Sequence, residues 1–147
     1  MNEWYRDPRF RQAEATQIAA DQAERDNQRD LAMVRHFEAA EALANLALSV
    51  PADYPHTRSD FAISATVSFA CAGRYDRAVQ FARRMLAQQG ALSMRGRGEL
   101  AVMLNEYEPL VLRAAPAGRF PTRRASQVEH RMRDTVRGVL SRKPEAA

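Results

Sequence analysis

The chain of 147 residues contains one cysteine, one lysine and six glycines, and aromatic side chains make up only 7% of it. Because Cys71 has no second cysteine to pair with, an internal disulfide is excluded, which fits a reducing cytoplasm. The shortage of aromatic residues and the abundance of alanine favour closely packed helices over a β-sandwich. We therefore predict an all-α fold, with Cys71 as a small buried residue.

Long hydrophobic runs are also missing. No stretch of eighteen apolar residues occurs, and the first ten residues, MNEWYRDPRF, lack the apolar core of a signal peptide. We therefore expect a cytoplasmic protein with no membrane insertion. The lone lysine, Lys143, stands against twenty-one arginines among the 22 basic residues, which indicates a GC-rich and hence bacterial coding genome.

Residue patterns that carry catalysis are absent as well. The three histidines, His36, His56 and His130, lie far apart, and none has a cysteine, aspartate or glutamate at a spacing typical of zinc sites. Two glycines at Gly96 and Gly98 lack the lysine and the preceding strand of a phosphate-binding loop. We therefore expect neither an enzyme nor a metal or other cofactor.

What the sequence does contain is helix-forming segments separated by prolines. Residues up to Val50 hold no glycine, and no proline after Pro8, which suits the first turn of a helix. The polar run at 26–30 divides this segment, so that either two helices, about 9–26 and 29–49, or one bent helix is possible. Antiparallel packing favours two, because a long single helix would leave its apolar face uncovered.

A second segment, from Phe61 to Gly90, predicts two shorter helices folded back on each other at Ala72-Gly73-Arg74. Apolar and small side chains recur three and four residues apart on both helices, which places them on one face of each. Gly73 suits the left-handed conformation that ends a helix, and Asp76 suits the N-cap of the next.

This segment resembles a tetratricopeptide repeat. The resemblance rests on small residues of the first helix, then an aromatic, a Gly-x-Tyr turn and small residues of the second helix: Ala62, Ala65, Thr66, Phe69, Gly73, Tyr75, Ala78 and Ala82. Ala62 and Ala82 depart from the larger residues usual in the family. The resemblance implies antiparallel hairpins, about five or six helices in all, and a groove lined by the first helix of the hairpin. The implied groove residues, which would receive a partner helix or peptide, are Asp60, Ile63, Ser64, Val67 and Ala70.

A third helical segment follows Gly90. Ser93 is a candidate N-cap, and an apolar set from Leu100 to Tyr107 precedes Pro109. Gly96 and Gly98 predict a late start for this helix. We expect it to cover the preceding hairpin as a capping helix.

The end of the chain is strongly basic. From Arg113 onward nine basic residues face three acidic ones, which gives +6, so the remainder carries −2 of the total +4. The apolar stripe of the predicted last helix, including Val128 and Leu140, could fold back on the groove or pair with a second copy in a homodimer. Its predicted basic face comprises Arg123, Arg124, Arg131, Arg133, Arg137 and Arg142.

Together these patterns divide the chain into a loose N-terminus, a helical domain, a linker and a basic amphipathic helix, at 1–7, 8–112, 113–121 and 122–143. The function they favour is a non-enzymatic protein–protein interaction module, an adaptor or regulatory subunit, with an acidic protein as one possible partner. The alternative is a nucleic-acid-associated protein that binds phosphates through the basic face.

Overall fold

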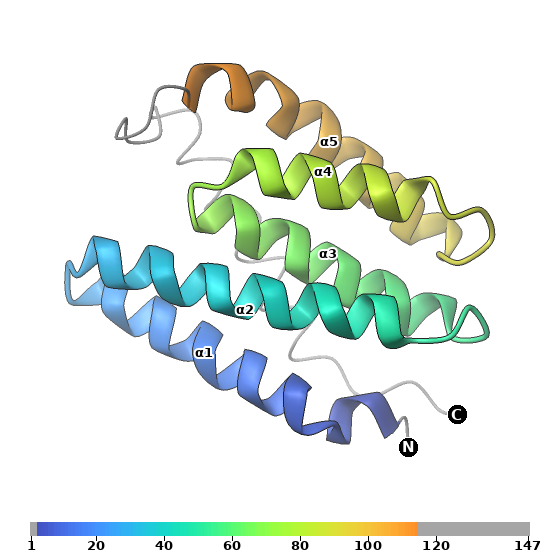
Figure 1. The fold of residues 1–147 in the computed structure, drawn as a ribbon, viewed down its shortest axis with the longest axis horizontal. Helices are drawn as coiled ribbons and strands as arrows, with labels where there is room; N and C mark the ends of the chain where they lie inside the picture. Colours follow the sequence, from blue (N-terminus) through green and yellow to red (C-terminus); the bar gives the residue numbers. More distant parts are fainter. Residues whose placement is uncertain (1–2, 115–147) are drawn as a thin grey trace.

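The computed structural model describes residues 3–114 of the chain. In that range it contains five α-helices, one short 3-10 helix and no strand, so the prediction of an all-α fold is confirmed. The elements, drawn in Figure 1, are η1 (Glu3–Arg6), α1 (Pro8–Arg25), α2 (Arg29–Ser49), α3 (Pro55–Cys71), α4 (Tyr75–Leu86) and α5 (Met94–Ala114).

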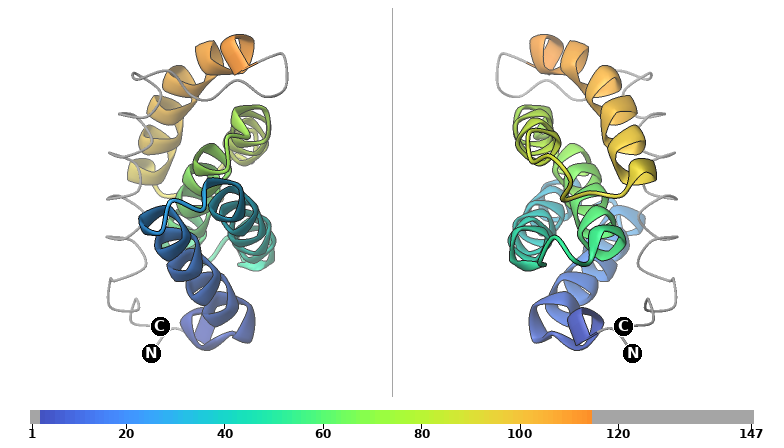
Figure 2. Two further views of the ribbon diagram at one scale, coloured as in Figure 1. Left: turned by 90° about the vertical axis from the view of Figure 1, so that its left-hand side faces the viewer. Right: turned by 90° about the vertical axis from the view of Figure 1, so that its right-hand side faces the viewer.

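Successive helices pack antiparallel in chain order. α1 packs on α2, α2 on α3 and α3 on α4, and α5 covers both α3 and α4, as expected for a capping helix. The end-on views of Figure 2 show this stack, with α3 in its middle. Because α3 has neighbours on several sides, 14 of its 17 residues are buried, whereas α4 keeps a polar outer face.

The first hairpin settles the alternative left open by the sequence: two helices form, not one bent helix. The chain reverses at Asn27, which has a positive φ of 57°. The amide of Gln28 donates to the carbonyl of Ala23 at 2.8 Å and closes the end of α1. At the other end of α1 the Asp7 carboxylate accepts from the Arg9 amide at 2.8 Å, directly before Pro8.

The second hairpin turns where the sequence predicts. Gly73 has a φ of +73°, and the Arg74 amide donates to the carbonyl of Phe69 at 2.9 Å. The prediction for Asp76 as an N-cap is wrong, because α4 already begins at Tyr75. Asp76 instead accepts two hydrogen bonds from the Arg74 guanidinium, each at 3.0 Å.

α5 begins earlier and ends later than predicted. Ser93 caps it as expected, since its hydroxyl accepts from the Gly96 amide at 3.0 Å. The helix nevertheless starts at Met94, and Gly96 lies against Ser59 of α3, where a side chain would not fit. It also continues through Pro109 to Ala114, two residues into the predicted linker.

The N-terminal residues are more ordered than predicted. Residues 3–6 form η1, and Trp4 and Tyr5 are half-buried against the core. The ring of Tyr5 lies 5.1 Å from that of Phe10 and 5.6 Å from that of Phe61. The segment predicted as loose thus contains a short helix whose two aromatic side chains pack on the core.

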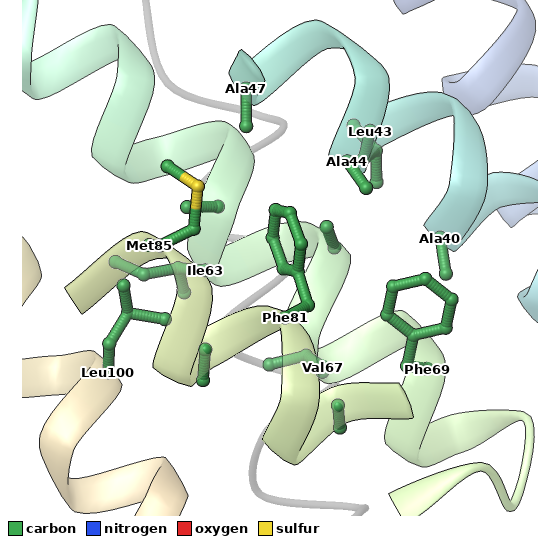
Figure 3. Packing of buried hydrophobic residues seen from close by; sticks show 14 of the residues in the cluster. Ala40, Leu43, Ala44, Ala47, Ile63, Val67, Phe69, Phe81, Met85 and Leu100 are labelled. Carbon is green, nitrogen blue, oxygen red and sulfur yellow. The ribbon is translucent and has the colours of Figure 1, made fainter. Parts of the chain in front are cut away.

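One core cluster runs through all five helices. Figure 3 shows Phe69 of α3 and Phe81 of α4 pointing toward α2, where Ala40, Leu43 and Ala44 lie opposite them. Cys71 is buried, as predicted, with 6% of its surface exposed. None of the described helices is long and apolar enough to cross a membrane. The predicted helix at 122–143 lies outside the described residues.

Candidate functional site

The groove predicted on α3 is not an open surface. Asp60 is partly exposed and its carboxylate accepts from the Tyr5 hydroxyl at 3.4 Å, but the other predicted residues are at most 3% exposed. They belong to the central helix of the stack, and Figure 3 shows two of them inside the core. The prediction that Ile63, Ser64, Val67 and Ala70 line an open groove is therefore wrong.

The predicted basic face lies outside the described residues. All of its arginines, from Arg123 to Arg142, follow Ala114, where the description of the chain ends. It therefore stays a prediction.

An open cleft lies instead between α2 and α4. Its volume is about 470 Å³, within the range of about 300–1,000 Å³ typical of ligand sites. Its apolar lining comes from three helices and consists of Ala44, Leu48, Phe69 and Phe81. Its polar lining consists of Glu41, Asn45, Arg77, Gln80 and Arg84.

Arg77 spans one end of the cleft. Its guanidinium lies 5.4 Å from the centre of the Phe37 ring and 5.2 Å from that of Phe69. It also donates to the Glu41 carboxylate at 3.4 Å, across from α4 to α2. These cation–π contacts and the ion pair hold the Arg77 side chain at the cleft lining.

Arg84 gives the cleft an available cation. Its side chain is exposed on α4, and it forms no ion pair with another residue in the range 3–114. Glu41 is already paired with Arg77, so the charged group of the lining that can pair with a ligand is the Arg84 guanidinium. The cleft thus combines an apolar floor with one positive charge that has no ion-pair partner among the described residues.

A second constellation is a buried polar network between α1, α2 and α3. His36 is 0% exposed; its Nδ1 lies 3.1 Å from the Gln17 amide nitrogen and its Nε2 lies 3.0 Å from the Glu24 carboxylate. The Ser68 hydroxyl donates to the Gln17 amide oxygen at 3.2 Å. Asp21 lies one turn before Glu24, and one donor atom each of Asp21, Glu24 and His36 fall within 4.8 Å of one another.

Sequence reasoning missed both features. A signal for His36 was present: it lies four residues after Ala32 and three before Ala39, on the buried stripe of α2. Its partners on α1 could not be identified without the register of the two helices. Likewise, nothing in the sequence indicated that Phe37 and Phe69 would both lie beneath Arg77.

Comparisons of the chain with protein-family models, with curated proteins and with solved structures find no match. The resemblance to tetratricopeptide repeats therefore stays a prediction.

Proposed function

We propose that the protein is a non-enzymatic interaction module that binds a helical or extended segment of a partner protein in the cleft between α2 and α4. The observation that carries this proposal is the cleft itself, with its apolar floor and with Arg77 and Arg84 in its lining. Antiparallel hairpins of tetratricopeptide type would be a suitable scaffold for such binding. The site differs from the groove that the resemblance implied, because that groove is filled by the core.

The chemistry of the lining defines the partner segment. Leu48, which is partly exposed at the lining, would be covered by an apolar side chain of the ligand, as in helix-in-groove recognition. An acidic side chain next to it would pair with Arg84. We therefore expect a short amphipathic segment with one aliphatic or aromatic anchor beside an aspartate or glutamate.

Selection from a random peptide library on the full chain tests this proposal. Enriched peptides should share the anchor and the acidic neighbour. Their binding should be lost in Leu48→Arg and reduced in Arg84→Glu. Matched controls are Val102→Arg and Arg11→Glu, which make the same changes at exposed positions of α5 and α1. No enrichment, or equal binding by cleft and control variants, would refute the proposal.

Nucleic-acid binding through Arg123–Arg142 is the alternative that the +6 charge of the last part of the chain favours. It would give affinity for a labelled duplex that falls steeply with salt concentration. It would also respond to charge reversal at Arg124, Arg131 and Arg133, and not to changes in the cleft. That result, together with no selected peptide, would replace the interaction module as the proposed function.

A further inference from the structure

The buried polar network has the composition and the spacing of a metal site. Asp21 and Glu24 present carboxylates from one face of α1, and His36 presents an imidazole from α2. We propose that these three residues bind a divalent transition-metal ion of the zinc type. The site is distinct from the cleft between α2 and α4 and does not depend on the function proposed for that cleft.

The distances fit such an ion. Zinc lies about 2.0–2.2 Å from nitrogen and oxygen ligands, so two ligands of a tetrahedral ion are about 3.4 Å apart. Nε2 of His36 and Oε1 of Glu24 are already 3.0 Å apart. The donor oxygen of Asp21 lies within 4.8 Å of both and would have to move closer to become the third ligand. One coordination position would then be left for water or for another ligand.

The residues behind His36 suit a metal ligand. A ligating histidine usually donates its second ring N–H to an oxygen, which fixes the tautomer and the ring. Gln17 lies at that nitrogen, and rotation of its amide by half a turn would bring the oxygen to Nδ1. The Ser68 hydroxyl, at 3.2 Å from the amide, can accept as well as donate and so serves both orientations.

The donor set also indicates which ion. One imidazole nitrogen with two carboxylate oxygens suits zinc, manganese or iron. Calcium prefers six to eight oxygen ligands and magnesium an octahedron of oxygens, which this set does not supply. Bound between α1 and α2, the ion would hold the first hairpin together, so binding should raise the thermal stability of the chain.

Calorimetric titration of the full chain with zinc or manganese chloride, after treatment with a chelator, tests the proposal. We expect one ion per chain and a higher melting temperature with metal. Cobalt(II), added in place of zinc, should give a visible absorption spectrum typical of an ion with few ligands. Glu24→Gln, which keeps the shape of the side chain, should abolish these responses. Gln17→Met should weaken binding by about 10- to 100-fold, as second-shell changes typically do.

Three controls separate this site from other metal binding. Glu38→Gln changes an exposed carboxylate of α2, and His56→Gln changes an exposed histidine of α3. His130→Gln removes the histidine beyond the described residues. All three should bind like the unchanged chain. If none of the metals binds, or if Glu24→Gln binds metal as well as these controls do, the network is only a hydrogen-bonded buried histidine.

Discussion

The two hairpins of this protein are held together by different chemistry. Between α1 and α2 the buried residues are mostly alanines, with the network of Gln17, His36 and Glu24 among them. Between α3, α4 and α5 aromatic pairs join the small buried residues: Phe69 lies 6.2 Å from Phe81, and Tyr75 lies 5.7 Å from Tyr107.

The two kinds of contact contribute differently to the free energy of folding. Apolar contacts are non-directional and stabilise in proportion to the area that they remove from water. A buried polar network stabilises little in net terms, yet loses much when one member is left unpaired. The second hairpin should therefore supply most of the folding free energy, whereas the first should respond to ions and to changes of single polar atoms.

The largest loss of stability is expected from a change in the aromatic contacts of α3. Phe69→Ala removes a ring that is 1% exposed and contacts Phe37, Phe81 and the guanidinium of Arg77. We expect a loss of about 3–5 kcal/mol in the free energy of unfolding, measured by urea denaturation followed by circular dichroism. Val102→Ala, at a side chain that is 53% exposed, is the control and should stay within about 0.5 kcal/mol. A loss below about 1 kcal/mol for Phe69→Ala would contradict the aromatic account.

The contact of α3 with α5 offers a second test with an internal control. Gly96→Ala would place a Cβ against the hydroxyl and Cβ of Ser59, so we expect a cost of about 1–3 kcal/mol from overpacking. Gly98→Ala, two residues along the same helix, meets no atom within 4 Å. It should stabilise by up to about 1 kcal/mol through helix propensity. Melting temperatures that move in the same direction would show that close approach does not explain Gly96.

The polar network should give an effect of similar size. Ser68→Ala removes the hydroxyl that donates to Gln17 and leaves a buried amide oxygen without this donor. We expect a loss of about 1–3 kcal/mol. Ser64→Ala is the matched change one turn earlier: its hydroxyl is buried and has no hydrogen-bond partner in the part of the chain that the structure describes. Its removal should be neutral or stabilising, and equal losses for the two serines would contradict the role of the network.

The same contrast decides how much the sequence could predict. The buried residues of α4 recur three and four positions apart, and Gly73 marks the turn before it, so this hairpin and its reversal were predicted correctly. α3 is apolar or small on every side, and sequence alone cannot tell which of its faces a groove would use; the structure fills them all. Its small residues indicate close packing, and the prediction took that packing surface for a binding surface.

The candidate sites were beyond the sequence for a related reason. Both depend on the register between helices, which brings Glu24 to His36 and Arg77 to Phe37. Register follows from how alanine-rich faces fit together, and many registers of such faces look equivalent along the sequence. The end of α5 was placed too early because the linker was predicted to begin at residue 113, whereas the helix continues to Ala114.

The smallest effect concerns pH and compares one carboxylate of each hairpin. The hydrogen bond from the Arg9 side chain lowers the pKa of Asp7 in α1's cap, and that from Arg74 lowers the pKa of Asp76 at the start of α4. A carboxylate with a lowered folded-state pKa stabilises the fold above its unfolded pKa, here 3.8, and loses that stabilisation as pH falls through the folded value.

Both pairs are open to solvent, with Arg9 48% and Asp76 54% exposed, so each should contribute at most about 1 kcal/mol. Asp7→Asn keeps a side chain that can cap α1, and therefore removes only the charge. Unfolding free energies measured near neutral pH and at about pH 3 should fall less in Asp7→Asn and Asp76→Asn than in the unchanged chain. If the two variants lose the same free energy as the unchanged chain, these ion pairs play no part in its acid sensitivity.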